Sequence, residues 1–284
     1  MNILVTGATG NLGTAIVKFL QQMNTANLSV GVRDLEKAAH YKKQGLDVRV
    51  VNFDEPATLV KAFENIDRVL VMSTFGTPEQ VVMHQKAVVE AAKEAGVNQL
   101  VYPSVINADT SDFYLAQTHR LREHVLFNSG IDYVILRNNW YVENEWQTVQ
   151  GCLQGAPWVT AAGDGKVGWT SRIDLAEAAA NVLVDEGHAN HIYDLSGENL
   201  TQAQFVATLN DVANVNVQVL EVDDAAYAAM LRQGGVPENF VPMLVLHQQG
   251  MRNGDLEAKR SDLSMLLGRP ETSLGDTLKQ LLQG

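Results

Sequence analysis

Three glycines at fixed spacing near the N-terminus could form a phosphate-binding turn. The sequence begins MNILVTGATGNLGTAIVKFL, in which the glycines separate a short apolar run from residues with helical spacing. Glycine permits a tight turn, and a helix N-terminus offers unpaired N–H groups and a partial positive charge. A plain strand-to-helix turn is the alternative, but this context favours dinucleotide binding. We predict that a dinucleotide diphosphate is bound by the backbone of Gly7, Ala8, Thr9, Gly10, Asn11, Leu12 and Gly13.

Charged residues after the second predicted strand bear on the choice of cofactor. Arg33, Asp34 and Lys37 follow residues 28–32, near the place where dinucleotide folds contact the adenosine ribose. A guanidinium there pairs with the 2′-phosphate of NADPH, whereas an acid binds the ribose hydroxyls of NADH. Because Asp34 could instead cap a helix at Leu35, the sequence favours NADPH over NADH. The alternative for Arg33 is a solvated surface charge.

Further candidate cofactor contacts follow other predicted strands, at the edge where ligands of open α/β sheets bind. Phe53 and Asp54 suit an adenine contact; the alternatives are a core position for Phe53 and a helix cap before Pro56 for Asp54. Arg172 could reach a cofactor phosphate or could pair with Asp174. The remaining candidates for cofactor binding are Ser73, Thr74, Phe75 and Asn138.

Aromatic and amide side chains come after the sixth predicted strand. Trp140, Tyr141 and Asn144 follow Asn138 closely, and two rings with two amides could flank a nicotinamide and a flat substrate. We therefore predict that Trp140, Tyr141 and Asn144 bind the substrate. Packing in the core is the alternative for Trp140.

The elements that must position these residues alternate regularly along the first half of the chain. Hydrophobic periodicity predicts strands at 3–5, 28–32, 48–51, 66–72, 99–102 and 133–136, with helices at 15–23, 35–45, 56–63, 83–95 and 116–128. This order predicts an α/β fold with a Rossmann-like doubly wound parallel sheet.

The second half of the chain is less regular. We expect Asp174 to cap a helix through Asp185, and residues 191–195 to form a strand that rejoins the main sheet. A helix at 201–213, a strand at 217–222 and a helix at 224–233 follow. These elements predict a dinucleotide-binding domain over 1–150, to which 171–197 returns, and a smaller C-terminal α/β substrate lobe over 151–284.

The composition argues against several classes of function. The 284 residues include 21 Lys and Arg against 33 Asp and Glu, so a net charge of −12 would repel a nucleic-acid backbone. A single cysteine, Cys152, cannot form an internal disulfide or a four-ligand zinc site, which fits a reducing compartment. No run approaches the roughly 18 apolar residues of a membrane-spanning helix. We expect a cytoplasmic protein without nucleic-acid or membrane partners, and the sequence leaves a homodimer open.

Several stretches together are similar to a known family. VTGATGNLG, VRDLEKA, the HxxxE at residues 119–123, LRNNWYVEN and AAGDGK resemble the NmrA-like group of atypical short-chain dehydrogenases. Within that group the chain looks most like the type 2 class of NADPH-dependent quinone oxidoreductases, with triphenylmethane reductases as near relations. The resemblance implies an NADPH-binding Rossmann lobe, a small C-terminal lobe, and an electron-poor aromatic substrate in the cleft between them.

The resemblance also identifies what the chain lacks. Standard short-chain dehydrogenases use a Tyr with a Lys four residues later, and none of the seven tyrosines here has a Lys at that spacing. His119 and Glu123 occupy the corresponding helix, and Ser104 aligns with the family's catalytic Ser. Glu123 could orient His119 as a histidinium that stabilises negative charge on the reduced substrate. A surface helix pair is the alternative, and two ligands are too few for a metal site.

The reaction implied is direct hydride transfer from NADPH to a quinone, without flavin or metal. A quinone needs little acid catalysis, because the added hydride restores aromaticity and yields a stabilised phenolate, while the protein orients the reactants. Loss of the Tyr–Lys pair is then intelligible. Two alternatives stay open: a redox-sensing regulator that binds NADP(H) without turnover, and a reductase of triarylmethane dyes.

Overall fold

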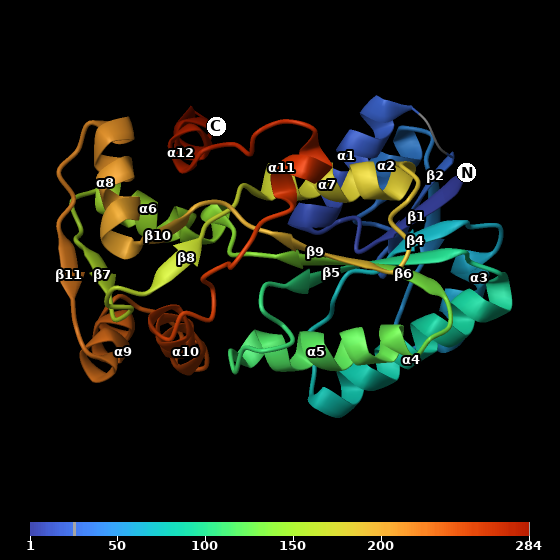
Figure 1. The fold of residues 1–284 in the computed structure, drawn as a ribbon, viewed down its shortest axis with the longest axis horizontal. Helices are drawn as coiled ribbons and strands as arrows, with labels where there is room; N and C mark the ends of the chain where they lie inside the picture. The colour runs from blue at the N-terminus through green and yellow to red at the C-terminus, as the bar shows by residue number, and fades with distance from the viewer. Residues whose placement is uncertain (25–26, 284) are drawn as a thin grey trace.

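The centre of the molecule is a seven-stranded parallel sheet with the order β3-β2-β1-β4-β5-β6-β9 (Figure 1). The computed structural model describes residues 1–24 and 27–283. The strands are β1 (Asn2–Thr6), β2 (Asn27–Val32), β3 (Asp47–Val50), β4 (Arg68–Leu70), β5 (Gln99–Val105), β6 (Asp132–Asn138) and β9 (His191–Leu195). The first six follow the strand order of dinucleotide-binding Rossmann sheets, which confirms the predicted fold class.

Helices cover both faces of this sheet (Figure 1). One face is covered by α1 (Asn11–Met23), α2 (Ala39–Lys43), α7 (Arg172–Val184) and α11 (Leu263–Leu267), and the other by α3 (Pro56–Phe63), α4 (Pro78–Ala95) and α5 (Tyr114–Phe127). Ile3 and Leu4 are both fully buried but belong to different apolar clusters, because successive strand side chains point to opposite faces. The sheet is thus the middle of three layers.

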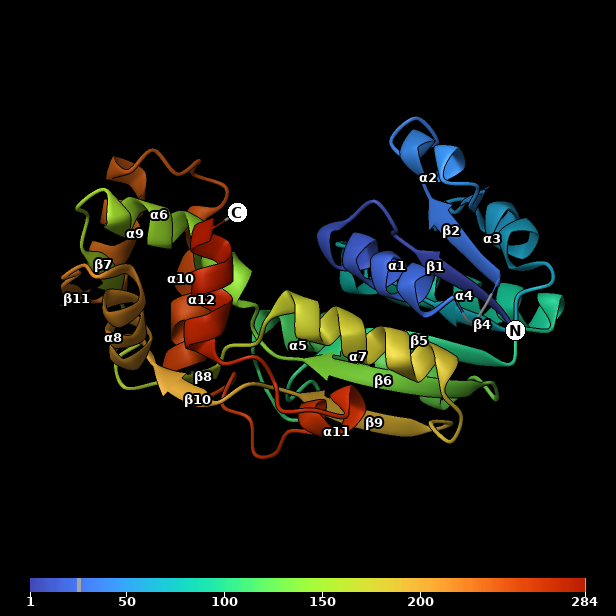
Figure 2. The same cartoon turned by 90° about the horizontal axis from the view of Figure 1, so that it is seen from above.

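A smaller lobe follows β6. Its strands form two pairs, β7 (Trp158–Thr160) with β11 (Val219–Glu221) and β8 (Lys166–Gly168) with β10 (Asn199–Thr201). Its helices are η1 (Val142–Glu145), α6 (Trp146–Leu153), α8 (Gln202–Ala213), α9 (Asp224–Gln233), α10 (Val241–Arg252) and α12 (Leu274–Gln283). Trp158, Trp169 and Phe205 pack in a third apolar cluster, which also includes Val105 of β5 and Ala116 of α5. Figure 2 shows β6 pointing toward this lobe, which therefore lies beyond the carboxyl ends of the strands.

The chain returns to the sheet through α7 and β9. Helix α7 packs against α1, and β9 pairs in parallel with β6, with Ile192 opposite Ile135. The predicted cap at Asp174 is wrong, because α7 begins at Arg172 and Ser171 is the capping residue. No helix among the described residues is long and apolar enough to span a membrane.

Local capping explains where the helix boundaries depart from the predicted ones. Helix α4 starts at Pro78 rather than at residue 83, because Thr77 and Gln80 form a capping box that nucleates an earlier turn. Helix α2 is only five residues long. Asp34 Oδ1 accepts a 2.9 Å hydrogen bond from the Glu36 amide and so closes a turn, and the cap predicted at Leu35 is wrong.

Asp174 joins α7 to the C-terminal segment, and its replacement is expected to destabilise the fold. The carboxylate is 1% exposed and accepts from Arg269 at 2.9 Å, from the Thr272 amide at 2.5 Å and from the Thr272 hydroxyl at 2.8 Å. Since Asp174→Ala removes a buried acceptor and leaves the part-buried Thr272 amide and hydroxyl without their partner, we expect a loss of about 2–4 kcal/mol in the free energy of unfolding, measured with urea.

The control is Glu177→Ala, which removes the more exposed carboxylate on the same Arg269. A partly solvated pair contributes little, so we expect a loss below about 1 kcal/mol. Equal losses in the two variants would contradict the assignment of Asp174 as the anchor.

Candidate functional site

The turn after β1 depends on glycine at two positions. Gly7 has a φ of +59°, which side chains rarely adopt. A Cβ at Gly13 would lie 2.3 Å from the Gly7 carbonyl oxygen and 3.0 Å from the Ala8 Cα, so α1 could not pack this closely on the turn with any other residue. The spacing of the glycines therefore sets where α1 begins.

The N-terminus of α1 is open to an anion. Its N-cap is Gly10, and no side chain among the described residues caps it. Thr77, Ser171, Thr201 and Asp223 cap α4, α7, α8 and α9, whereas, within the described part of the chain, α2, α3, α5, α6, α10 and α11 lack a side-chain cap as α1 does. The Thr14 amide makes the first intrahelical bond, to the Gly10 carbonyl at 2.8 Å, so the amides of the first helical residues precede it. These amides and the helix dipole fit a diphosphate.

Neighbouring elements hold this turn in place. The Ala8 carbonyl accepts from the Thr14 hydroxyl at 2.9 Å and from the Tyr41 hydroxyl at 2.8 Å. The Met72 amide donates to the Thr6 hydroxyl at 2.9 Å, which joins the end of β1 to the segment after β4. The carboxyl ends of β1 and β4 thus form one continuous edge at the point where the strand order reverses.

The residues expected at the adenosine half of a cofactor lie on the loops after β2, β3 and β4. Arg33 and Lys37 are exposed. Phe53 is half-buried, and Asp54 is exposed with its carboxylate bonded to His84 Nε2 at 2.8 Å. The alternative of Asp54 as a helix cap is wrong, because the N-cap of α3 is the next residue. After β4, Thr74 is half-buried, whereas Ser73 and Phe75 are exposed.

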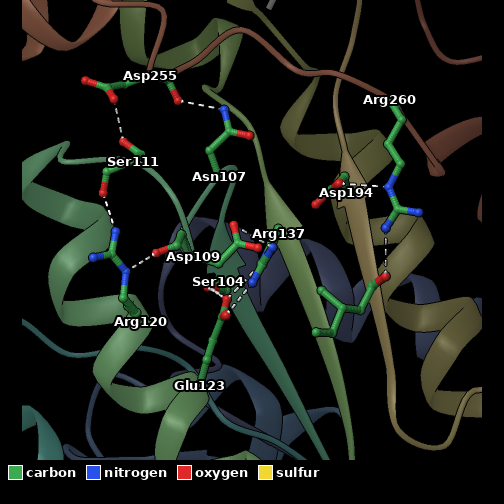
Figure 3. Close-up of polar contacts among 12 residues, drawn as sticks. Ser104, Asn107, Asp109, Ser111, Arg120, Glu123, Arg137, Asp194, Asp255 and Arg260 are labelled. Carbon is green, nitrogen blue, oxygen red and sulfur yellow. Dashed lines mark hydrogen bonds and ion pairs between the residues drawn. The ribbon is translucent and has the colours of Figure 1, made fainter.

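A buried ion pair lies at the carboxyl end of β5 and β6 (Figure 3). Arg137 Nη2 is 2.7 Å from Glu123 Oε2, and its Nε donates to Oε1 at 3.1 Å. The Ser104 hydroxyl donates to the same Oε1 at 2.6 Å, and Arg137 Nη1 also contacts Asp109 at 3.0 Å. Glu123 is 1% exposed, so its charge is compensated inside the protein by the guanidinium.

The predicted pairing of His119 with Glu123 is therefore wrong. His119 Nδ1 instead shares a 2.7 Å hydrogen bond with the Tyr102 hydroxyl. Burial, with a smaller contribution from the charge of Arg122, lowers the pKa of His119 to about 3, so the ring is neutral at pH 7. Because they are four residues apart on one helix, both side chains point toward the sheet. There His119 bonds to Tyr102 on β5 and Glu123 to Arg137 on β6.

The end of β6 combines an unpaired amide with aromatic rings. Asn138 Oδ1 is buried without a hydrogen-bond partner among the described residues, and Asn138 Nδ2 donates to the Tyr141 hydroxyl at 3.2 Å. The Trp140 ring is half-buried, with its centroid 4.8 Å from that of His247. Asn144 is exposed. A buried oxygen without a donor fits a ligand amide at this position.

Arg172 lies beside this group without contacting Asp174. Its guanidinium carbon is 5.4 Å from the centroid of the Tyr141 ring, and its amide donates to Glu143. The alternative that Arg172 pairs with Asp174 is wrong, because Asp174 is bound to the C-terminal segment. Arg172 thus lies on the same side as Asn138 and Tyr141.

Several polar residues near the site were not found from the sequence. The Tyr114 hydroxyl is hydrogen-bonded to His247 Nε2, and burial raises the Tyr114 pKa to about 12 and lowers the His247 pKa to about 4. Glu145 accepts from the indole N–H of Trp140 at 2.9 Å, and burial raises its pKa. Each pair joins residues distant in sequence or without periodicity, so no local pattern identified them. Among the described residues, no group of three His, Cys, Asp or Glu could hold a metal.

The neutral state of His119 predicts a contribution to acid sensitivity. The unfolded chain binds a proton at this residue below about pH 6.5, whereas the native protein does so only near pH 3, so stability falls on acidification. Between pH 7 and pH 5 the free energy of unfolding should fall by about 2 kcal/mol less in His119→Asn than in the unmodified protein, as measured by denaturant titration at each pH. His124→Asn, at an exposed position of the same helix, is the control. If the stability of His119→Asn depended on pH as that of the unmodified protein does, the conclusion that the His119 ring stays neutral in the native protein would be contradicted.

Comparison with known proteins agrees with this geometry. A family model described as NAD(P)H-binding matches residues 7–186. The chain is 34% identical over 281 residues to quinone oxidoreductase 2 of Escherichia coli, covering 98% of each chain. The crystal structure of an E. coli NADPH-dependent quinone oxidoreductase complexed with NADPH matches with a TM-score of 0.92 and 33% identity over 99% of each chain. These matches confirm a Rossmann lobe of the NAD(P)H-binding family.

A second relative extends the comparison. Triphenylmethane reductase of Citrobacter sp. matches over the whole of both chains with a TM-score of 0.95 and 30% identity. Both relatives are reductases, so the alternative of a redox-sensing regulator is not favoured. The chain belongs to the NAD(P)H-binding family, in which it is a relative of quinone oxidoreductase 2 and triphenylmethane reductase.

Proposed function

We propose that this protein is an NADPH-dependent oxidoreductase that transfers a hydride directly to a quinone or a similar electron-poor aromatic acceptor. The observation that carries the proposal is the turn after β1, whose glycine geometry and uncapped helix fit a diphosphate. It stands in a chain that is similar over 98% of its length to a quinone oxidoreductase. The single free cysteine, which fits a reducing compartment, supports a cytoplasmic location.

We propose that different loops bind the different parts of NADPH. The amides at the start of α1 would bind the diphosphate, and Arg33 with Lys37 would bind the 2′-phosphate. The Asp34 carboxylate is held to the turn after β2, because its Oδ1 accepts from the Glu36 amide. Asn138 Oδ1 would accept a hydrogen bond from the nicotinamide carboxamide, which would satisfy the buried oxygen. When bound, NADPH supplies the hydride.

The residues near the end of β5 and β6 would orient the reactants rather than exchange protons with them. The Ser104 hydroxyl is committed to Glu123, and the charge of Glu123 is balanced by Arg137. His119 is neutral at pH 7 and bonded to Tyr102. This group contains no strong base of the Tyr–Lys type. A quinone suits such a site, because its reduced form is a stabilised phenolate that water can protonate.

The acceptor would lie against the half-buried ring of Trp140. Its indole N–H is held by Glu145 at 2.9 Å, which fixes the ring plane. Tyr141 and Asn144 follow on the same segment, and the rings of Tyr114 and His247 extend the aromatic surface toward α10. A flat electron-poor ring stacks favourably on such a surface. Because triphenylmethane reductase has the same fold, a triarylmethane dye is the second candidate acceptor.

The first test compares acceptors directly. NADPH absorbance is followed with several quinones, with a triarylmethane dye and without acceptor, and NADPH binding is measured by calorimetry. We expect binding, and oxidation with quinones well above the rate without acceptor. Gly13→Val should lose both, because its side chain would overlap the Gly7 carbonyl. Binding without turnover for every acceptor would favour a regulator instead.

The second test concerns the choice between NADPH and NADH. Arg33→Ala should raise the KM for NADPH by roughly 10- to 100-fold, since a charge-assisted phosphate contact is lost, while the KM for NADH changes little. Lys18→Ala removes a positive charge from an exposed position of α1 and serves as the control. Equal losses with both cofactors would remove the preference for NADPH.

A further inference from the structure

His84 on α4 joins two loops that come from different strands. The side chain is 9% exposed and lies between Asp54, after β3, and Thr74, after β4. Its Nε2 is 2.8 Å from Asp54 Oδ1, and its Nδ1 is 3.3 Å from the Thr74 hydroxyl. The ring centroid is also 6.0 Å from that of Phe53. One imidazole therefore holds both loops through polar contacts.

These contacts form a directed chain of hydrogen bonds that begins at Arg122 on α5. Arg122 Nη2 donates to the Thr74 carbonyl and lies 3.3 Å from the Thr74 hydroxyl oxygen. If the Thr74 hydroxyl oxygen accepts from Arg122, its own O–H can donate to His84 Nδ1. In the tautomer that fits this arrangement, Nε2 carries the ring proton and donates a hydrogen bond to Asp54 Oδ1. Each donor in this series of hydrogen bonds then has an acceptor. His84 therefore couples the position of the Asp54 carboxylate to that of Thr74.

The loops held by His84 flank the glycine turn. In the sheet, β1 has β2 and then β3 on one side and β4 on the other, so the loops after β3 and β4 lie on opposite sides of the turn. The segment after β4 has few packing contacts of its own, since Ser73 and Gly76 are exposed and Phe75 is 95% exposed. The path of this segment is therefore fixed by the hydrogen bond from Met72 to Thr6 and by the hydrogen bonds of Thr74.

We propose that His84 is a positioning residue for the adenosine half of the cofactor. By fixing Asp54 and Thr74 at once, it sets the separation of the two loops between which the adenosine half would bind. The proposal rests on the proposed function only in taking NADPH as the cofactor. It assigns His84 no contact with the nicotinamide or with the acceptor.

The test separates the two halves of the cofactor. His84→Phe keeps an aromatic ring next to Phe53 but removes both hydrogen bonds. We expect the Kd of NADPH and of 2′,5′-ADP to rise about tenfold, as for the loss of a hydrogen bond to a charged group. The KM for reduced nicotinamide mononucleotide, which lacks the adenosine half, and kcat at saturating NADPH should stay unchanged. NADH should lose affinity by the same factor as NADPH, unlike in an Arg33 variant.

Two further variants keep the proposal falsifiable. His84→Gln retains a donor for Asp54 and should recover part of the affinity, and Thr74→Val should reproduce part of the loss if His84→Phe does not fold. Met83→Ala, at an exposed position of the same helix, is the control.

Equal losses with 2′,5′-ADP and with the mononucleotide, or unchanged binding of 2′,5′-ADP in both His84→Phe and Thr74→Val, would overturn the proposal. Because 2′,5′-ADP binding needs no acceptor, failure to reduce quinones would refute the proposed reaction without affecting this result.

Discussion

The contact between Gly13 and the Gly7 carbonyl is the constraint on which the rest of the site depends. A Cβ at Gly13 would come within 2.3 Å of that oxygen, so the absence of a side chain lets α1 start directly over the turn. This brings the uncapped amides of α1 to the edge where β1 and β4 end. A diphosphate bound by these amides would determine which of the loops after the other strands contact the rest of the ligand.

Features governed by short-range periodicity could be predicted from the sequence. Strand and helix alternation gave the parallel sheet and the return of residues 191–195 to it, because each element has a regular apolar pattern and recognisable ends. Boundaries shifted where a local cap decided them, as at Thr77 in α4 and Ser171 in α7. The glycine turn was the most predictable part of the site, since its geometry depends on residues within one turn of the chain.

Long-range partners could not be predicted in the same way. The four-residue spacing of His119 and Glu123 indicated a pair, and in an isolated helix it would favour one. In the folded protein both side chains face the sheet, where a buried carboxylate requires a compensating charge, and Arg137 provides it from β6. Asp174 and Thr272 are 98 residues apart, and Asp54 and His84 are 30 apart, so only the fold brings each pair together.

The same ion pair limits the chemistry that the proposed site can perform. With Glu123 balanced by Arg137 and His119 neutral, a hydride acceptor at this edge would have to accommodate its new negative charge mostly within its own ring system. An ordinary ketone or keto sugar would form a basic alkoxide and would need a strong positioned acid, whereas a quinone gives a stabilised phenolate and a triarylmethane cation becomes neutral. The preference for electron-poor aromatic acceptors would then follow from an ion pair that stabilises the packing of α5 on β5 and β6. Stability of the fold and choice of substrate would thus have one electrostatic cause.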